Sequence, residues 1–294
     1  MKADHAQLLG DRYRLTSPLG QGGMGIVWRA HDRRLARDVA IKELRPSQHG
    51  DRFDVHTARR HALREARSAA RLSHPAIVTV HDLLEEDGRL WIVMELVEAL
   101  TLQATAWHLG RLPVHWTAWI GFHLLSGLRH AHAAGVLHRD IKPGNVLLTG
   151  ERVVLSDFGI AVLQDETPHT TTMPIVGSPG YIAPERLNGH PATQAADLWS
   201  FGATLYFAVE GRPPAGGAGG DILATRPPEQ SRPPRRAGAL RRLLEGLLEP
   251  DPAERLTSDQ AALLLSEILR KEGIAVPPMR LTGSGIFPPG AFTM

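Results

Sequence analysis

Short runs of hydrophobic and polar residues with a β-like pattern make up the first part of the chain, and glycines punctuate them. The runs are YRLTSPLG from Tyr13, GIVWRAHD from Gly25 and RDVAIKEL from Arg37, and each is typical of a strand. Two more strands are expected over Ala76–Leu84 and Leu90–Val97. Because only short turns separate the first three runs, they predict an antiparallel sheet.

A helical period replaces the strand-like runs in two regions. Over Val55–Leu72 small apolar residues recur among arginines, which predicts one helix beside the sheet and an α+β first unit. Beyond Leu100 the helical period dominates, and Asp197–Val209 is apolar nearly all round, as expected of a buried helix. Thr257 and Ser258 have the composition of a helix cap. The second part of the chain is therefore predicted to be mostly helical.

Two stretches lack any period. Gly211–Gly238 is rich in Pro, Gly and Arg and reads as a loop or an insert. The prolines of residues 273–294 exclude regular helix, which predicts a poorly ordered tail. We therefore expect three parts: residues 1–97 with a core from about residue 13, residues 98–272, and the tail.

Composition narrows the class of protein. The chain has 294 residues, of which 43% are hydrophobic and 22% charged, as in soluble globular proteins, and one catalytic unit accounts for this length. The formal charge of +2 is too small to indicate a nucleic-acid partner. There is no cysteine, and no apolar stretch has the roughly 20 residues that cross a membrane. We expect a cytoplasmic protein without a membrane span.

A glycine-rich turn lies between the first two runs. Gly20, Gly22, Gly25 and Val27 form G-x-G-x-x-G-x-V, whose bare backbone can approach phosphate oxygens closely. The same glycines are compatible with a dinucleotide-binding unit that uses Glu43, but that unit requires a helix after the third glycine, where a strand is predicted. No Gly-Lys-Ser/Thr follows, which excludes a Walker phosphate loop. The pattern favours a phosphate-holding hairpin.

Lys42 ends the run VAIK on the third predicted strand. Taken alone, such a lysine is as well explained by a solvated surface, but after a glycine-rich hairpin it is placed to meet the α- and β-phosphates of a nucleotide. Glu65, on the following helix, is the expected partner that fixes the ammonium group. We interpret the two as a pair that serves phosphoryl transfer.

The segment HRDIKPGN, residues 138–145, carries the strongest chemical signal. Asp140 can accept the proton of an attacking hydroxyl, Lys142 can neutralise the transferred phosphoryl group, and Asn145 can offer a neutral oxygen to Mg²⁺. Asp157 opens the tripeptide DFG and adds a carboxylate ligand. HRD or DFG alone is explained by a capped turn, but chance does not easily place all of these elements in one order.

From about Tyr13 to Leu269 the chain resembles the protein kinases, in particular the eukaryotic-like (Hanks-type) Ser/Thr kinases of bacteria. The resemblance rests on the motifs above and on the blocks SHPAIVTVHDL, IVMELVE and HRDIKPGNVLL. It implies an α+β bilobal fold, with a small antiparallel sheet and one main helix in the first lobe and a larger, mostly helical second lobe. It also implies transfer of the γ-phosphoryl group of ATP to Ser or Thr hydroxyls of protein substrates in signal transduction, with Mg²⁺ or Mn²⁺.

The same resemblance assigns the adenine-binding residues. Met94 becomes the gatekeeper, and Glu95 to Val97 become the hinge that meets adenine. Three apolar residues are expected to enclose the adenine ring: Val27, Ala40 and Leu147.

Further roles that the resemblance implies are structural and regulatory. Residues 157–185 become the activation segment, Glu185 is expected to pair with Arg255, and Asp197 is expected to brace the catalytic loop. Arg139, next to the catalytic aspartate, implies control by a phosphate on the activation segment. The candidates for autophosphorylation, which self-association would permit, are Thr170, Thr171 and Thr172.

Two other functions fit parts of this pattern. A pseudokinase binds nucleotide without transferring phosphate, but it usually lacks one of the transfer residues, and none is missing here. A small-molecule phosphotransferase of similar fold can share Asp140 and Asn145. The triplet APE at residues 183–185 and Arg255 favour a protein acceptor instead, because those parts serve a peptide groove.

Histidine and arginine clusters have alternative readings of their own. The sequence has 15 histidines, and His130, His132 and His138 lie close together, but their spacing matches no zinc site and favours packing, with His138 inside the catalytic loop. A group of arginines is interpreted as a solvated face or as a docking site for an acidic partner: Arg232, Arg235, Arg236, Arg241 and Arg242.

Overall fold

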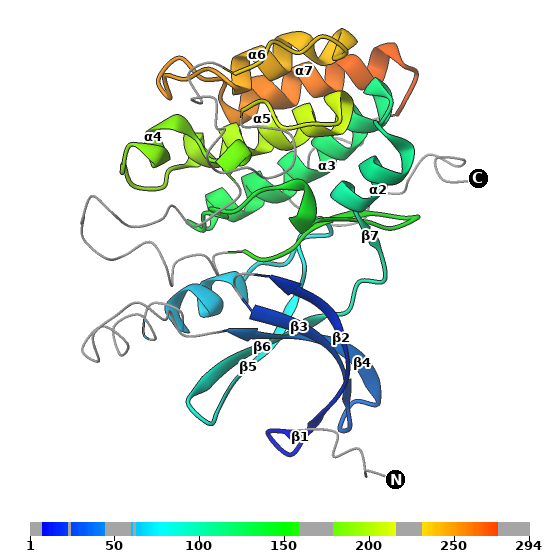
Figure 1. Cartoon of the computed structure of the whole chain (residues 1–294), viewed down its shortest axis with the longest axis vertical. Helices are drawn as coiled ribbons and strands as arrows, with labels where there is room; N and C mark the ends of the chain where they lie inside the picture. The colour runs from blue at the N-terminus through cyan, green and yellow to red at the C-terminus, as the bar shows by residue number, and fades with distance from the viewer. Residues whose placement is uncertain are drawn as a thin grey trace. The chain divides into compact units, whose positions relative to one another are not determined.

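The computed structural model describes residues 8–22, 25–44, 60, 63–158, 179–215 and 231–275, and their contacts form two compact units. The first unit takes the described residues up to Ser73 together with Val78–Glu98. The second takes His74–Ile77 and the described residues from Ala99 onward. Figure 1 shows a sheet in the first unit and most of the helices in the second. The sequence places the boundary between residues 97 and 98, so the two divisions differ mainly in His74–Ile77.

A six-stranded antiparallel sheet forms the first unit, in the order β1-β2-β3-β4-β6-β5. Its strands are β1 (Leu8–Leu9), β2 (Tyr13–Gly22), β3 (Gly25–Asp32), β4 (Arg37–Leu44), β5 (Val80–Glu86) and β6 (Arg89–Glu95). The strands predicted from residues 13, 25 and 37 are confirmed. The expected start at Ala76 is wrong, since β5 begins at Val80.

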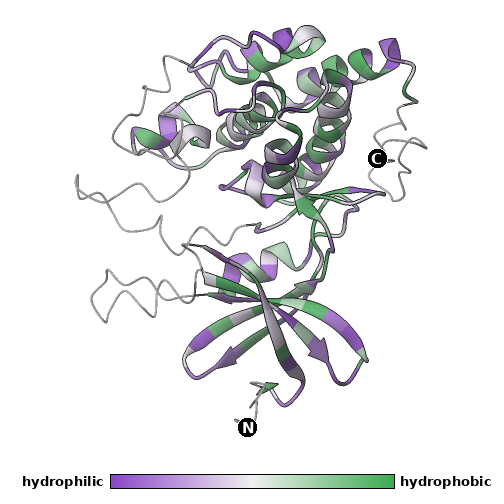
Figure 2. Ribbon diagram, turned by 45° about the vertical axis from the view of Figure 1, so that its right-hand side comes forward, coloured by the Kyte–Doolittle hydropathy of each residue, from purple (hydrophilic) through white to green (hydrophobic). Residues whose placement is uncertain are grey.

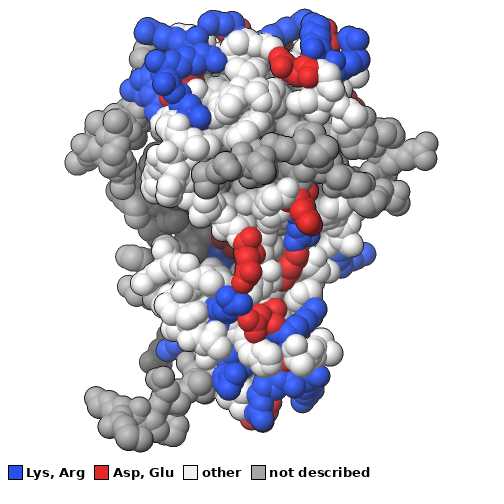
Figure 3. All heavy atoms as spheres, turned by 90° about the vertical axis from the view of Figure 1, so that its right-hand side faces the viewer, with Lys and Arg blue, Asp and Glu red and all other residues white. Residues whose placement is uncertain are grey.

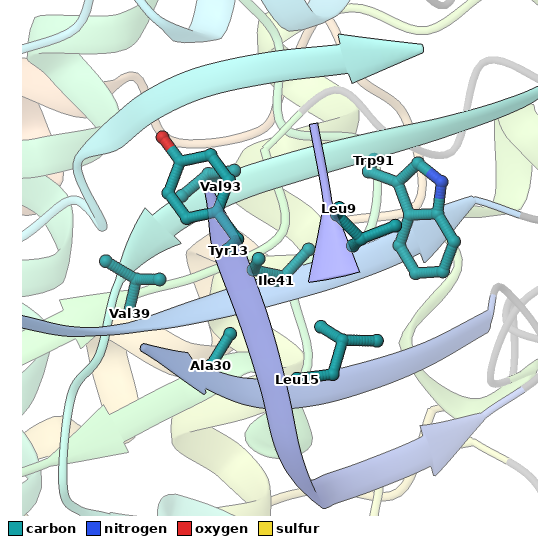
Figure 4. Packing of buried hydrophobic residues seen from close by; sticks show 8 residues of the cluster. All are labelled: Leu9, Tyr13, Leu15, Ala30, Val39, Ile41, Trp91 and Val93. Atoms are coloured by element: carbon teal, nitrogen blue, oxygen red, sulfur yellow. The ribbon is translucent and has the colours of Figure 1, made fainter. Parts of the chain in front are cut away.

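One face of this sheet packs into a core of its own. In Figure 2 hydrophobic and hydrophilic residues alternate along the strands. Figure 4 shows the buried side chains of the core: Leu9, Tyr13, Leu15, Ala30, Val39, Ile41, Trp91 and Val93. Leu9 is fully buried, so the core begins before residue 13, where the sequence places its start. Strand β1 has two residues, too few for a period to reveal it.

The opposite face of the sheet packs against a helix. Residues 63–69 are helical and lie within the predicted range Val55–Leu72, most of whose earlier part is outside the described residues. Ala66 of this helix packs with three apolar side chains of the sheet: Leu44, Leu90 and Ile92. The first unit therefore has the α+β composition that the sequence predicts.

The second unit is mostly helical, as predicted. Its helices are α2 (Leu102–Leu109), α3 (Val114–Ala133), α4 (Pro184–Leu187), α5 (Gln194–Glu210), α6 (Arg241–Leu247) and α7 (Ser258–Lys271), and α7 begins with the predicted cap at Thr257. Short 3-10 turns lie at Pro143–Asn145 (η1), Pro179–Tyr181 (η3) and Gly238–Leu240 (η6). The period does not predict its small antiparallel sheet of β7 (Leu100–Thr101), β8 (Val146–Leu148) and β9 (Val153–Leu155). In the described part of the chain, no helix is both long and apolar enough to cross a bilayer.

Helix α5 lies in the core of the second unit. Residues 196–210 are all buried, as the apolar pattern predicts. Thr193 caps its start, because the side-chain oxygen accepts a hydrogen bond from Ala196 N. A Cβ atom on Gly202 would lie 2.7 Å from Leu247 Cβ of α6. Glycine therefore permits the close approach of α5 and α6.

The segment His74–Ile77 is fastened to the second unit by its backbone and by a histidine. Leu155 N of β9 donates to Ala76 O over 2.9 Å, and Ile77 forms a single bridge with Leu155. His74 Nε2 lies 3.1 Å from Ser126 Oγ of α3. These contacts explain why the apolar run that begins at Ala76 does not start β5.

Two half-buried histidines make the stability of the second unit depend on pH. Burial lowers the pKa of His74 and of His123 to about 4, and repulsion from a neighbouring histidine acts in the same direction. The unfolded chain, with ordinary histidine pKa values near 6.5, therefore binds more protons between about pH 4 and 6.5. The contribution of these two histidines to the free energy of unfolding is fully present above about pH 6.5 and is lost as the pH falls toward about 4.

We expect the free energy of unfolding to fall by about 2 kcal/mol between pH 7 and pH 5, a value already discounted for partial solvent contact. Urea unfolding at the two pH values measures this fall. In the double variant His74→Gln, His123→Gln the difference between the two pH values is expected to shrink by more than half. An unchanged difference would contradict the assignment to these two side chains.

Candidate functional site

The segment HRDIKPGN follows α3 and is fastened to α5 by one carboxylate. Asp197 Oδ2 accepts hydrogen bonds from His138 N and His132 Nε2, and Oδ1 accepts one from Arg139 N, each 2.8 Å long. The carboxylate is only 3% exposed, so these donors take the place of water. Asp197 thus fixes the backbone immediately before Asp140, as the sequence predicts.

Three candidate residues meet on this segment. Lys142 Nζ lies 2.7 Å from Asp140 Oδ2, and Asn145 Nδ2 donates to the same oxygen over 3.0 Å and to Asp140 O over 2.8 Å. Among the described residues, no donor reaches Asp140 Oδ1. The arrangement therefore fixes one carboxylate oxygen by a cation and an amide, and it leaves the other oxygen able to accept a hydrogen bond or a proton.

A hairpin brings Asp157 close to Asn145. Strands β8 and β9 pair Val146 with Leu155, and just beyond this pair Ser156 N donates to Asn145 O over 2.9 Å. Because both hydrogens of the Asn145 amide are directed to Asp140, its oxygen is the atom left for a metal ion. An amide oxygen and a carboxylate are ligands that hard divalent cations prefer, so these residues fit such an ion.

His138 has a packing role. Its Nδ1 accepts from Asp140 N over 3.2 Å, and its Nε2 donates to Ser156 O over 2.8 Å. The ring lies 4.5 Å from that of Phe158, and burial lowers the pKa of His138, so the imidazole is neutral. In the described ranges, no group of three or more His, Cys, Asp and Glu residues can hold a metal. A metal held by Asn145 and Asp157 would therefore take further ligands from water or a bound molecule.

Two non-glycine residues of the site have left-handed backbone conformations. Arg139 has a φ of 69° and Asp157 a φ of 66°. Such conformations cost about 1–3 kcal/mol each and persist only where the surroundings impose them. At Arg139 the constraint is the hydrogen bond from its backbone amide to Asp197 Oδ1. At Asp157 it is the hydrogen bond from the preceding residue, Ser156, whose backbone amide donates to Asn145 O. No residue type or spacing in the sequence indicates these conformations.

The nucleotide-binding candidates of the first unit share one face of the sheet. Val27 of β3 is opposite Lys42 of β4, and Ala40 of β4 is opposite Met94 of β6. Since side chains alternate along a strand, all four lie on the face opposite the core of Figure 4. Lys42 is 3% exposed on this face. Glu65 lies half-buried on the helix that covers part of the same face, and its pairing with Lys42 stays a prediction.

The dinucleotide-binding alternative is wrong, because a strand and not a helix follows the glycines. Gly25 has a φ of 140°, a conformation that favours glycine, and it begins β3. Gly20 lies on β2 with open space where a side chain would stand, while Gly22 is paired with Gly25. Glu43, the acidic residue of that alternative, forms an ion pair of 2.7 Å with Arg89.

The hinge and adenine candidates lie in both units. Glu95 ends β6, and its backbone amide donates to Thr79 O over 2.9 Å. Leu147 is half-buried on β8 of the second unit. The adenine contacts of Glu95, Val97 and Leu147 stay predictions.

Glu185 and Arg255 form the ion pair that the sequence predicts. Arg255 Nη1 and Nη2 donate to the two carboxylate oxygens over 2.7 and 2.9 Å. The remaining N–H groups donate to three backbone carbonyls: those of Ala195, Glu249 and Pro250. Arg255 is 4% exposed, and its guanidinium lies 5.1 Å from the ring centre of Trp199. The pair joins α4 to the turn before α7.

Some predicted residues lie outside the described residues, and some functional residues were not predicted. Thr170, Thr171 and Thr172 fall in the first group, so the regulatory role of Arg139 stays a prediction. Sequence reasoning missed His132 as a donor to Asp197, Ser156 as the link to Asn145, and Phe158 as the partner of His138. Each of these roles depends on contacts between distant segments. The one feature of the sequence that could have pointed to Ser156 and Phe158 is their position beside Asp157.

Comparisons with known proteins agree with these observations. The protein kinase domain family matches residues 13–264. The serine/threonine-protein kinase PknA of Mycobacterium tuberculosis is 39% identical over 259 residues, which cover 85% of this chain and 59% of PknA. The serine/threonine-protein kinase PkaA of Streptomyces coelicolor is 37% identical over 287 residues, which cover 91% of this chain and 51% of PkaA. The chain thus spans between half and three-fifths of the length of these curated relatives.

A solved structure supports the fold. The crystal structure of Rad53 1–466 in complex with AMP-PNP has a TM-score of 0.69 with this chain and covers 85% of it and 64% of its own length. The two sequences are 23% identical, so this likeness concerns the fold alone.

Proposed function

Because the chain belongs to the protein kinase family, as a domain of the bacterial Ser/Thr type, we propose that it transfers the γ-phosphoryl group of ATP to serine and threonine hydroxyls of proteins. One observation carries the proposal: Asp140, Lys142 and Asn145 form a hydrogen-bonded set, and Asp157 lies two residues beyond the backbone pair of Val146 and Leu155. This set supplies the groups that phosphoryl transfer requires.

Asp140 acts on the acceptor. Its Oδ1 accepts the proton of the attacking Ser or Thr hydroxyl and orients the hydroxyl oxygen, while Oδ2 is held by Lys142 and Asn145. Lys142 then neutralises negative charge on the phosphoryl group in transfer. The hydroxyl oxygen forms its bond to phosphorus as the bond to the ADP oxygen breaks, without a covalent enzyme intermediate.

The metal residues support a divalent ion. Members of this family use ATP and a divalent metal, and for this chain we propose Mg²⁺, held by the Asn145 amide oxygen and the Asp157 carboxylate together with phosphate oxygens of ATP. When bound, Mg²⁺ neutralises charge on the phosphates.

The first unit holds the nucleotide. The glycines of β2 and β3 offer backbone amides to the phosphates, and Lys42 meets the α- and β-phosphates. Val27, Ala40 and Met94, on the same face as Lys42, offer apolar contact to adenine. The reaction draws on ATP, and we therefore place the chain in the cytoplasm.

Self-modification extends the proposal. A second copy of the chain transfers the γ-phosphoryl group of ATP to one or more of Thr170, Thr171 and Thr172. Arg139 then pairs with the negative charge of the new phosphate group. Mass spectrometry of the incubated chain locates the phosphate, and an active enzyme that leaves all three threonines unmodified would remove this part.

A labelling experiment tests the function. With γ-labelled ATP, Mg²⁺ and a generic basic protein, the chain is expected to label serine and threonine, and a chelator is expected to abolish labelling until excess Mg²⁺ is added. Lys42→Met is expected to lower the rate by about 100-fold or more with an unchanged circular-dichroism spectrum, because the phosphates lose a fixed cation. Lys271→Met is the matched control, since its lysine is 65% exposed and pairs with Glu267 on α7.

Two outcomes would contradict the proposal. Labelling by the wild-type chain no stronger than that of Lys42→Met would indicate a pseudokinase. Efficient labelling of small metabolites without protein labelling would favour a small-molecule phosphotransferase, against which the buried pair of Glu185 and Arg255 speaks.

A further inference from the structure

Arginines gather around the C-terminal end of α5, at the opposite end of that helix from Asp197. Burial and the charge of Glu210 raise the pKa of Tyr206, and the charges of Arg212, Arg232 and Arg235 oppose this rise, so the three guanidinium groups lie within electrostatic range of one side chain. Arg236 follows directly in the chain. We name these four residues the arginine surface. In Figure 3 Lys and Arg side chains are crowded at the level of α6 and α7 in the second unit.

The backbone presents these arginines in a fixed way. Arg232 N donates to Pro214 O over 3.0 Å, and Arg236 N donates to Glu210 Oε1. Pro234 and Ala237 are buried on either side of the exposed Arg235 and Arg236. The turn is therefore anchored at both ends and holds its charged side chains outward, which reduces the ordering that binding requires.

Arginines outnumber carboxylates in the stretch of sequence that carries this surface. From Ala208 to Leu244 the sequence has seven arginines, no lysine and three acidic residues. One of the three is Glu210, which is 7% exposed and is occupied by the Arg236 amide. Among the described residues, no carboxylate forms an ion pair with the arginine surface.

Other arginines of the chain contrast with this surface. Arg12 pairs with the buried Asp32, Arg89 with Glu43, and Arg255 with Glu185. A solvated face of arginines remains the simplest reading of a charge run on its own. The anchored turn and the local excess of positive charge favour a binding role instead. Several guanidinium groups are held close together although their mutual repulsion is unfavourable, and a bound anion would offset that repulsion.

We propose that the arginine surface binds an acidic segment of a protein, rich in Asp and Glu. Guanidinium groups match carboxylates in charge and geometry. A nucleic acid is disfavoured because the chain as a whole carries a formal charge of only +2. The inference adds to the proposed function, but binding itself requires neither ATP nor transfer.

The distance between the arginine surface and the catalytic loop determines how far an acidic segment must lie from the acceptor hydroxyl in a substrate. Asp197 and Gly211 lie at opposite ends of α5, about 20 Å apart at the rise of a helix. An acidic segment bound at the arginine surface reaches the catalytic loop through about six or more extended residues. Tethering of this kind raises the effective concentration of the acceptor hydroxyl.

Binding without ATP tests the proposal directly. A fluorescent peptide of twelve residues with eight glutamates is expected to bind the wild-type chain at low salt, and the same peptide with glutamine in place of glutamate is not. The triple variant Arg212→Gln, Arg232→Gln, Arg235→Gln is expected to bind the glutamate peptide about tenfold more weakly. Its thermal midpoint should match that of the wild type, since no described partner accepts from these side chains.

A matched triple variant separates this site from general attraction. Arg14→Gln, Arg33→Gln, Arg34→Gln removes the same charge from exposed positions of the first unit and is expected to bind within twofold of the wild type. Equal loss in both triple variants would overturn the proposal, as would equal binding by the wild type and the arginine-surface variant. Tighter binding of a single-stranded oligonucleotide of equal charge would overturn it in favour of nucleic acid.

A kinetic measurement connects the surface to catalysis. An acceptor peptide joined to the acidic segment by ten Gly and Ser residues is expected to have a KM about tenfold lower than its glutamine counterpart, with equal kcat. The arginine-surface variant should lose this difference and keep its rate on the glutamine peptide. Binding without any transfer would contradict the proposed function and leave the docking surface intact, whereas transfer without a KM difference would overturn docking of substrates.

Discussion

Replacing Asp140 with asparagine is expected to lower the rate of phosphoryl transfer by about 10²–10⁴-fold while the chain stays folded. Asparagine has nearly the same shape and can still accept a hydrogen bond from Lys142, which is 2.7 Å from the carboxylate. It cannot take a proton from an attacking hydroxyl at neutral pH. The chemical step should therefore suffer while the contacts that hold the loop persist.

Steady-state kinetics with a Ser-containing acceptor measure this effect. The KM for ATP is expected to change by less than about threefold, because Lys42 and the sheet of the first unit are unaltered. Asp259→Asn is the matched control: it makes the same substitution in the second unit, at a carboxylate that is 77% exposed and pairs with Arg129. An Asp140→Asn enzyme that retains more than a tenth of wild-type kcat would remove Asp140 from the chemistry.

Local patterns in the sequence predict much of the fold. The runs that begin at Tyr13, Gly25 and Arg37 become β2, β3 and β4, because each is a β-like run of at least eight residues and short turns separate the runs. The buried helix α5 follows from an apolar composition that no solvent-facing helix would have. These features depend on neighbours in sequence, which the pattern records.

Contacts between distant segments account for what the pattern does not predict. Strand β1 is two residues long and exists because β2 offers it a pairing edge. His74–Ile77 joins the second unit through β9 and α3, although its apolar residues continue into β5 without a break. The sheet of β7, β8 and β9 likewise consists of strands too short to show a period.

The same division holds in the candidate site. The motif of residues 138–145 identifies Asp140, Lys142 and Asn145, because their roles require these residue types in one loop. Their geometry depends on residues that no motif marks. His132 and Ser156 fix Asp197 and Asn145 by hydrogen bonds, and Asp157 has a positive φ beside Ser156. The motif can be found in the sequence because it lies within one short segment. The hydrogen bonds that fix its geometry join segments that meet only in the folded chain.

The buried ion pair of Glu185 and Arg255 is expected to contribute the largest single effect on stability. Arg255→Met leaves a carboxylate without its cation at a side chain that is only 11% exposed, and it removes the donors to three backbone carbonyls. Removing one partner of a buried pair costs about 3–5 kcal/mol, mainly because the remaining charge is desolvated and unpaired. The thermal midpoint of the second unit should fall by roughly 10 °C.

Circular dichroism during heating measures the midpoint, and two further variants identify the cause. Arg241→Met removes the same side-chain type from an ion pair of 3.4 Å to Glu245 in which both partners are about half exposed, and its loss should stay below about 1 kcal/mol. The double variant Glu185→Gln, Arg255→Met is expected to recover part of the loss, because no buried charge remains. If the double variant is less stable than Arg255→Met by the full cost of Glu185→Gln alone, the two side chains are not coupled, and the loss comes from packing against Trp199 instead.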